Sequence, residues 1–221
     1  MNSTGFNATD AQNDSFFYVA RTTGTVTINV VGGKGNFSYK SAGATVNIVI
    51  DPVTTLFTVT DTGGTPISGA RVYALASNGT GPLPYQDSVT ISRSGTTATV
   101  THTAHGLSTN DKVLIQGITD KEEDNGVQTI TVTGTNSYTY TTTNSGSTSY
   151  TGTIISTGVI FEEATNGSGQ VSDTRTFSTD QPINGWVRKS TSAPYYQQSN
   201  ISATIDSVTG LTQIIQLISD E

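Results

Sequence analysis

Apolar and polar residues alternate in short runs along almost the whole chain, and these runs are rich in Thr, Val and Ile. Alternation with a period of two is typical of strands that bury one face, and β-branched side chains fit a pleated sheet. No segment shows a sustained helical period, and the best helical candidate, 211–218, also alternates like a terminal strand. We therefore predict about fifteen short strands. The runs that predict them are 17–21, 25–31, 45–50, 56–60, 71–76, 97–101, 112–116, 127–133, 137–142, 152–156, 159–161, 171–177, 185–189, 201–205 and 211–218.

Glycine-containing turn signals separate these runs. Asn-Gly pairs at 78–79, 125–126 and 166–167 favour tight turns between strands. The Gly-rich stretch 32–35 lacks the spacing of a phosphate-binding loop and is predicted to be a flexible hairpin. Short strands at such regular spacing predict sandwiches or small barrels rather than units in which strands alternate with helices. The predicted fold class is therefore all-β.

A change of composition divides the chain into three parts. Residues 1–53 are a polar arm followed by a β segment, which we expect to serve in docking or oligomerisation. Residues 54–88 and 158–221 share Gly-rich turns between strands, whereas 89–157 is dominated by Thr, Ser, Gly, Val and Ile. An insertion at an exposed loop tip costs little loop-closure entropy. We therefore predict one sandwich, 54–88 plus 158–221, that is interrupted by an inserted β module, 89–157.

The charge balance excludes several classes of partner. The chain has 221 residues, of which 10 are Lys or Arg and 17 are Asp or Glu, for a net charge of −7. No basic patch is present to neutralise phosphates, so a nucleic-acid partner is not expected.

The absence of Cys excludes disulfides, thiol nucleophiles and Cys-ligated zinc. The polar stretch 1–15 lacks the features of a signal peptide, and no apolar run is long enough to span a membrane. We expect a protein made in the cytosol, with no membrane partner.

The two histidines, His102 and His105, are spaced i, i+3 beside Gly106. In a strand followed by a turn, this spacing is expected to send the two rings to opposite faces, which disfavours a shared metal ion. The sequence has no third His and no Cys to complete a zinc site. We therefore predict that the histidines stabilise the turn.

Carboxylate clusters are the other candidates for chemistry. The run 120–124 could bind calcium, but it lacks EF-hand spacing, so a solvated hairpin loop is the favoured interpretation. The pairs 122–123 and 162–163 could cleave glycosides, but adjacent residues of a strand face opposite ways. A Ser-His-Asp site would lack the G-x-S-x-G elbow. We predict no catalytic, cofactor-binding or metal site, and hence no enzyme.

The aromatic residues of most interest are Tyr85, Trp186, Tyr195 and Tyr196. One interpretation places Trp186 in the sandwich core and packs the two neighbouring tyrosines after Pro194. The other exposes them as anchors of a protein interface or as platforms that stack on sugars. On this basis Trp186, Tyr195 and Tyr196 are candidate interface residues.

The stretch Val59–Val72 contains the pattern D-x-x-G-x-P-I-x-G-A-x-V, which begins at Asp61. It resembles the opening of carboxypeptidase-regulatory-like and transthyretin-like sandwiches. A later pattern of those sandwiches, T-N/D-x-x-G-x-V/Y, is matched from Thr165 to Val171, although the two halves are far apart in the chain. The resemblance implies an Ig-like or transthyretin-like β-sandwich.

The stretch 97–142 includes the sequence VTHTAHGLSTNDKV, which begins at Val100 and has Asn110 where a Gly is usual. It resembles a small β module first described in ubiquitin-activating enzymes, as part of their first catalytic cysteine half-domain, and now common in phage proteins. This resemblance implies that the insertion is a small β-barrel-like module.

The combination of these parts with the segments 185–191, 194–196 and 219–221 is similar to the tails of virion structural proteins of tailed bacteriophages, and 17–49 resembles the segment before such a sandwich. The resemblance implies a non-enzymatic virion protein. The leading expectation is a surface-exposed capsid decoration or cement protein, which binds the major capsid protein or other virion proteins and forms a homo-oligomer on the particle. The alternative is a tail- or head-fibre adhesin that binds a host receptor or surface glycan.

Overall fold

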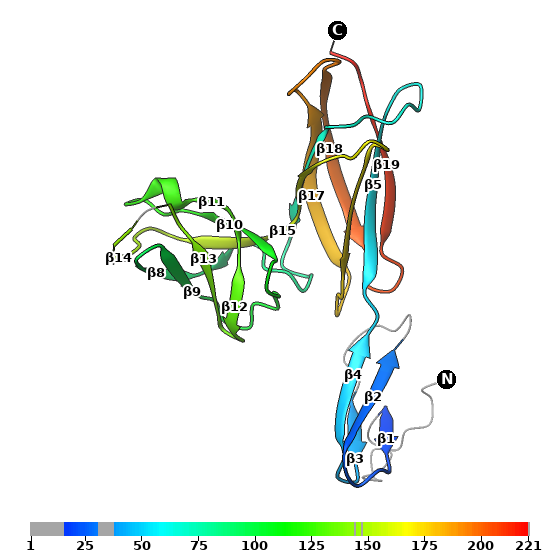
Figure 1. Cartoon of the computed structure of the whole chain (residues 1–221), viewed down its shortest axis with the longest axis vertical. Coiled ribbons are helices and arrows are strands. Elements are labelled where there is room, and N and C mark those ends of the chain that lie inside the picture. The colour runs from blue at the N-terminus through cyan, green and yellow to red at the C-terminus, as the bar shows by residue number, and fades with distance from the viewer. Residues whose placement is uncertain (1–15, 31–37, 144, 147, 221) are drawn as a thin grey trace.

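The structure, a computed structural model, describes residues 16–30, 38–143, 145–146 and 148–220 (Figure 1). The described residues are all-β, as predicted, and the one helix among them is the three-residue η1, Glu122–Asp124. None of their helices is long and apolar enough to cross a membrane. The predicted hairpin at 32–35 and the arm at 1–15 lie outside the described residues. The strands are β1 Phe17–Val19, β2 Thr25–Val30, β3 Tyr39–Ser41, β4 Thr45–Ile50, β5 Val53–Asp61, β6 Arg71–Ala76, β7 Asp87–Ser88, β8 Thr90–Ser94, β9 Thr97–Thr101, β10 Lys112–Gln116, β11 Gly126–Thr129, β12 Thr131–Gly134, β13 Ser137–Thr141, β14 Thr148–Ser149, β15 Ile155–Ala164, β16 Gln170–Arg175, β17 Gln181–Lys189, β18 Tyr196–Ile205 and β19 Leu211–Leu217.

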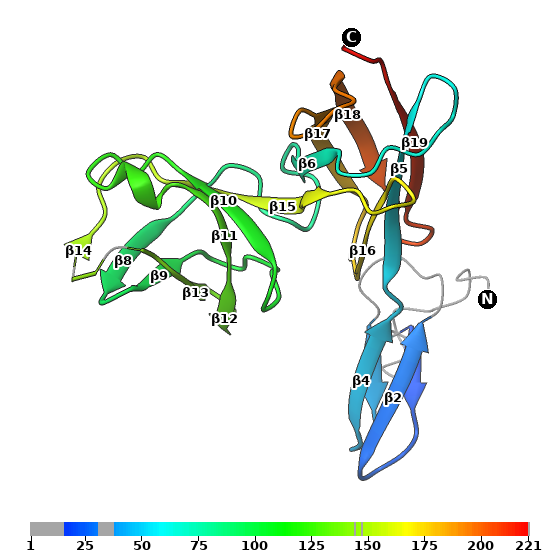
Figure 2. The ribbon, with the colours of Figure 1, turned by 45° about the horizontal axis from the view of Figure 1, so that its top comes forward.

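Strands β1 to β4 form a unit at the N-terminal end of the molecule, which we call the N-terminal unit (Figures 1 and 2). β1 pairs in parallel with β3, and β2 pairs in parallel with β4. The β2 sequence TVTINV lies in register on the β4 sequence TVNIVI, so that Val26 is paired with Val46 and Ile28 with Ile48. β2 and β4 therefore repeat the pattern T-V-x-I, which was a signal in the sequence that our sequence analysis missed.

The core of the N-terminal unit is small and separate from the core of the rest of the chain. Its buried members are Val19, Ala44 and Val46, with Val26, Ile28 and Ile48 packed against them. Two-stranded sheets are at best marginally stable in water, and parallel strands are normally covered on both faces. The unit is therefore short of buried apolar surface by the standards of an independent domain.

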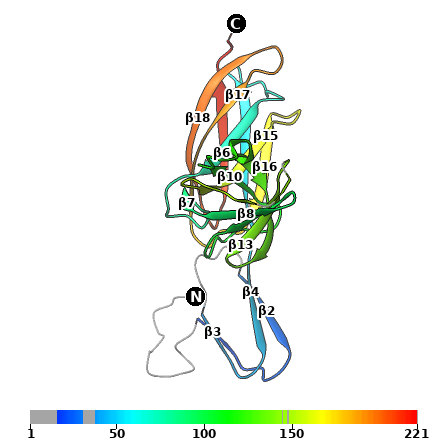
Figure 3. The same cartoon turned by 90° about the vertical axis from the view of Figure 1, so that its left-hand side faces the viewer.

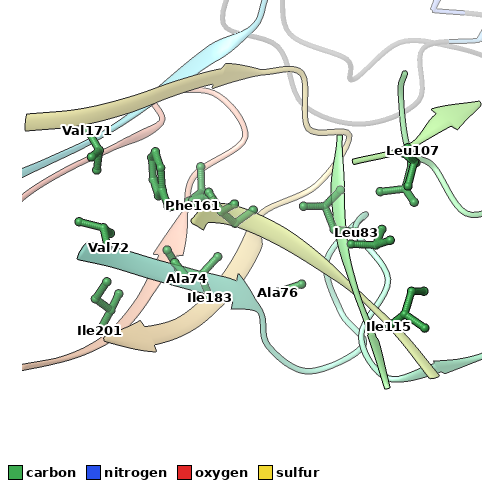
Figure 4. Close-up of a cluster of buried hydrophobic side chains, with 14 of the residues drawn as sticks. Val72, Ala74, Ala76, Leu83, Leu107, Ile115, Phe161, Val171, Ile183 and Ile201 are labelled. Atoms are coloured by element: carbon green, nitrogen blue, oxygen red, sulfur yellow. The ribbon is translucent and has the colours of Figure 1, made fainter. Parts of the chain in front are cut away.

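Two sheets pack face to face to form a sandwich, as predicted. One sheet has the order β16-β5-β19, and the other contains β15-β6-β17-β18. The terminal segment that alternated in the sequence is the strand β19, which pairs in parallel with β5. Alternate residues of β6, including Val72 and Ala74, point into the core (Figure 4). Across the two sheets, the rings of Phe57 and Phe161 lie 5.4 Å apart between centroids.

The two halves of the split sandwich motif meet in the structure. The Thr165 hydroxyl donates to the Ile67 carbonyl at 2.6 Å and accepts from the Ala70 backbone N–H at 3.0 Å. Gly169 has a φ of +72°, and a Cβ at this position would lie 2.5 Å from the carbonyl oxygen of Val59. Only glycine tolerates this conformation and this approach. These contacts give Thr165 and Gly169 a structural role where the two halves meet.

The inserted segment adds a five-stranded sheet of order β12-β13-β9-β8-β14 and contributes β10 and β11 to the seven-stranded sheet of the sandwich. One long strand, β15, belongs to both parts: its first half pairs with β10 and its second half with β6 (Figures 1 and 2). The apolar core is also continuous, because Leu107 and Ile115 of the insertion belong to the same cluster as Phe161 (Figure 4). The two parts are therefore coupled by a shared strand and a shared core.

Polar contacts fix the junction between the insertion and the sandwich. Arg175 of β16 lies 3.4 Å from the Asp111 carboxylate and also pairs with Asp173 at 2.5 Å. Asn110, where a glycine is usual, has a φ of +78°, a left-handed conformation that Asn tolerates better than other non-glycine residues. The chain therefore has a left-handed residue at the position where the resemblance implied a glycine.

Candidate functional site

The outer face of the β15-β6-β17-β18 sheet carries the strongest candidate for a functional site. Val72 and Ala74 of β6 are buried, and so is Val187 of β17. Because side chains alternate between the faces of a strand, Tyr73 and Trp186 point outward. Both are half-buried on the surface of the sheet rather than in the core. The interpretation that Trp186 fills the sandwich core is therefore wrong. Its neighbour Val187 points into the core, and the next side chain along a strand points to the opposite face. Figure 3 shows the four strands at the upper part of the molecule.

Strand register brings four outward residues into one row across this sheet. Glu162 is paired with Tyr73, Tyr73 with Trp186, and Trp186 with Asn200. The Tyr73 and Trp186 rings lie 5.7 Å apart between centroids, at an interplanar angle of 32°. The two rings together form an aromatic platform in the middle of the sheet.

A second row carries two arginines. Arg71 is paired directly with Arg188 on the neighbouring strand. Arg71 Nη2 lies 2.5 Å from Glu162 Oε1, and Lys112 Nζ lies 3.8 Å from the other oxygen of the same carboxylate. Arg188 is exposed and forms no ion pair with any described residue. The platform is therefore bordered by one neutralised and one unneutralised guanidinium group.

These side chains surround a surface hollow of about 520 Å³, which we call the outer-sheet hollow; Ser190, Thr191 and Gln198 complete its lining. The Gln198 amide donates to the Asn200 side chain at 3.3 Å. Partial burial raises the pKa of Tyr73, and the Glu162 carboxylate raises it further, so the phenol remains a hydrogen-bond donor at neutral pH. An aromatic platform with hydroxyl, amide and guanidinium groups around it is suited to binding a polar ligand that has an apolar face.

The other two candidate interface residues, Tyr195 and Tyr196, do not line the outer-sheet hollow. They follow the cis peptide bond between Ala193 and Pro194. Tyr195 is 43% exposed, and its backbone carbonyl accepts a hydrogen bond from the N–H of Asp220 at 3.0 Å. Tyr196 is half-buried and packs against the sandwich core. The structure therefore separates Trp186 from the tyrosines that the sequence analysis grouped with it.

His102 and His105 lie side by side, with ring centroids 5.9 Å apart, and both rings contact Tyr138. The expectation that they face opposite ways is wrong, because the chain leaves the strand and turns at Ala104, whose φ is +50°. His105 Nδ1 accepts from the Leu107 N–H at 3.0 Å, and Nε2 lies 3.0 Å from the Gly134 carbonyl. These bonds confirm that His105 stabilises the turn. Burial lowers the pKa of His102, against the opposing effect of Asp87.

The acidic run 120–124 is only partly a solvated loop, as its last residue shows. Asp124 is buried, and its carboxylate lies 2.9 Å from Arg93 Nη1. The Tyr150 hydroxyl donates to the same carboxylate oxygen at 2.5 Å. The prediction of a solvated loop is therefore wrong for Asp124, because a partner from β8 neutralises and buries it. Asp120 remains at the surface, where it accepts from the Thr151 N–H at 2.9 Å.

The two carboxylates of the 162–163 pair have different surroundings in the part of the chain that the structure describes. Glu162 pairs with Arg71, while its neighbour Glu163 is exposed on the other face of the strand. Among the described residues, no group of three or more His, Asp or Glu side chains could hold a metal ion.

The N-terminal unit presents the second candidate surface. Its exposed aromatic residues are Phe16, Tyr18 and Tyr39, each between 41% and 48% exposed. Apolar surface of this kind on a small unit is typical of a surface that contacts another protein. The sequence analysis expected docking from this region but named none of these three residues, which could have been found as aromatic residues beside the repeat.

Comparisons with known proteins add little. No family model and no curated protein matches the chain. Among solved structures, the chain is similar to the phage phi92 endosialidase, with a TM-score of 0.31 and 16% sequence identity over 69% of this chain. The chain spans only 31% of the length of that protein. A similarity this low carries no argument about function.

Proposed function

We propose that the chain is a non-enzymatic structural protein of a bacteriophage virion, and that it decorates the surface of the capsid. The observation that carries the proposal is the contrast between the two ends of the molecule. The N-terminal unit is small, basic and rich in exposed aromatic residues, whereas the remainder is larger and acidic. Such a contrast suits a protein that attaches at one end and projects at the other. The sequence resemblance to virion proteins supports the phage setting.

The N-terminal unit has the properties of the attaching end. In the segment 16–50, the sequence contains three basic residues and no Asp or Glu. Among the described residues, the sheets of the unit have two strands each, and an edge of such a sheet can accept a strand from a partner. The exposed rings of Tyr18 and Tyr39 add apolar contact area. The proposed partners are the major capsid protein or other virion proteins, with homo-oligomers forming on the particle.

The remainder of the chain has the properties of the projecting end. From Asp51 onward the sequence contains 7 basic and 15 acidic residues. A net negative charge disfavours association between copies that are free in solution. On a capsid, repetition of the attachment over the lattice would supply avidity from individually weak contacts.

Quantitative mass spectrometry of purified virions tests this function. A decoration protein is expected at on the order of tens to hundreds of copies per particle, in a constant ratio to the major capsid protein, because it follows the lattice. A few copies per particle would contradict decoration and would favour a position on the tail or at a single vertex.

A binding experiment tests the attaching end. Purified chain is added to particles that lack it, and the bound fraction is measured after sedimentation. The double variant Tyr18→Ser, Tyr39→Ser is expected to bind at least about tenfold more weakly, because it loses two exposed rings. The control is Tyr195→Ser, which removes an equally exposed ring from the sandwich. Equal losses in both variants would contradict attachment through the N-terminal unit.

The outer-sheet hollow favours a second candidate function, a tail- or head-fibre adhesin for a host receptor or surface glycan. Its aromatic platform lies on the sandwich sheet that contains β17, whereas the strands β1 to β4 of the proposed attaching end lie at the other end of the ribbon (Figure 1). The two functions differ in copy number, so the mass-spectrometric measurement separates them.

A further inference from the structure

We propose that the outer-sheet hollow binds a saccharide that carries a carboxylate, with a sugar ring over the Tyr73–Trp186 platform and the carboxylate at Arg188. The inference is independent of capsid decoration, because it concerns a different surface of the molecule. A protein at any position on a virion could carry such a site.

The first argument is the pairing of like charges. Arg71 and Arg188 lie directly opposite each other on adjacent strands, which is an unfavourable arrangement in a sheet. Glu162 neutralises Arg71 but leaves Arg188 without a counter-charge among the described residues. The hollow therefore has a local net positive charge in a chain whose net charge is −7. This local reversal of sign fits an anionic ligand.

The second argument is the kind of anion that an unpaired guanidinium group suits. Arg71 and Lys112 share the Glu162 carboxylate, so Arg188 is the guanidinium group of the hollow without a counter-charge among the described residues. A carboxylate carries one negative charge and accepts two parallel hydrogen bonds from a guanidinium group. The unpaired Arg188 therefore suits one carboxylate.

The third argument is the shape and chemistry of the remaining surface. The Tyr73 and Trp186 rings are half-buried, so their faces are held in place by the sheet while remaining open to solvent. The edges of the hollow carry the hydroxyls of Ser190 and Thr191 and the amide of Gln198. A sugar ring has an apolar face that stacks on aromatic rings and hydroxyls that bind such polar groups. A flat apolar partner would leave these polar groups without partners.

The experiment uses the full chain and an array of bacterial surface oligosaccharides in three sets: neutral, carboxylate-bearing and phosphate-bearing. The expected result is binding confined to carboxylate-bearing members, with loss of binding when their carboxyl groups are converted to methyl esters. Binding only to neutral or only to phosphate-bearing members would overturn the proposal. An array with no binding would overturn it as well.

Variants locate the binding in the hollow. Trp186→Ala and Arg188→Gln are each expected to weaken binding about tenfold or more, because each removes a central contact. Lys121→Gln is the matched control, since it removes one positive charge far from the hollow, in the loop before η1. Circular dichroism checks that each variant is folded. If Arg188→Gln and Lys121→Gln weaken binding equally, the effect is one of overall charge and the proposed site is wrong.

Discussion

Two arginine–carboxylate pairs in the molecule have opposite surroundings. In the inserted module, Arg93 and Asp124 are 4% and 2% exposed and lie 2.9 Å apart. On the outer sheet face, the side chains of Arg71 and Glu162 are 50% and 25% exposed. The first pair has a further buried partner in Tyr150, whereas the second has an unneutralised arginine beside it. The chemistry is similar, but the consequences for stability and for binding differ.

The difference in burial between the two pairs indicates which charged side chains stabilise the fold and which remain available to a ligand. A buried charge that loses its partner is left without solvation, so the buried pair must stay intact for the module to fold. An exposed pair contributes little to stability because water screens it. Arg188 of the outer-sheet hollow is therefore available to a ligand, and changing it should leave the fold nearly unaffected.

The largest expected effect comes from breaking the buried pair. Asp124→Ala should lower the free energy of unfolding by about 3–5 kcal/mol, because it leaves the Arg93 guanidinium buried without a counter-charge. Denaturant titration followed by circular dichroism measures the loss. The control is the triple variant Arg93→Leu, Asp124→Leu, Tyr150→Phe, which removes the whole polar group and should remain within about 2 kcal/mol of the native chain. A loss below about 1 kcal/mol for Asp124→Ala would contradict the structural role.

The next effect concerns alkaline pH. Burial raises the pKa of Tyr138 from 10.0 to about 12, against the effect of its hydrogen bond with Ser156. A raised pKa in the folded state means that the contribution to stability is complete below pH 10 and is lost as the pH rises to about 12. The expected contribution is about 2–3 kcal/mol at most. Denaturant midpoints between pH 9 and pH 12 should fall steeply, and Tyr138→Phe should make the fall less steep, with the remainder due to groups such as Tyr150, whose pKa burial also raises to about 12. An unchanged slope in that variant would show that Tyr138 is not the group involved.

The smallest effect is expected at the exposed pair. Arg188→Gln should change the free energy of unfolding by less than about 0.5 kcal/mol, and a small increase is expected because the variant relieves the opposition of Arg71 and Arg188. The same denaturant titration measures it. If Arg188→Gln destabilised the chain as strongly as Asp124→Ala, the distinction between the two regions would be lost.

Local sequence rules predicted the framework of the fold well. The alternation of residues in 211–218 identified a strand, and the split motif predicted one sandwich formed by 54–88 and 158–221, in which Thr165 bonds to Ile67. Both predictions depend on short-range patterns, which record side-chain direction and turn chemistry. The same rule could have placed Trp186 outward, since Val187 is buried next to it.

The sequence could not predict contacts that depend on distant partners. Asp124 resembled the rest of an exposed acidic run, and its burial depends on Arg93, which is 31 positions away. The proximity of His102 and His105 depends on the left-handed residue Ala104, which strand geometry alone does not anticipate. The opposed arginines Arg71 and Arg188 become neighbours only through the pairing of β6 with β17. In each case the missing information was the tertiary register.

The central claim, that the exposed arginine row borders a ligand site, is tested most directly through the intrinsic fluorescence of Trp186, the only tryptophan in the chain. Its emission is titrated with a carboxylate-bearing oligosaccharide and with the methyl ester of the same compound, and acrylamide quenching is measured at each end point. The account predicts a saturable change and reduced quenching with the acid but not with the ester. Unchanged emission and quenching at saturating acid would contradict the account.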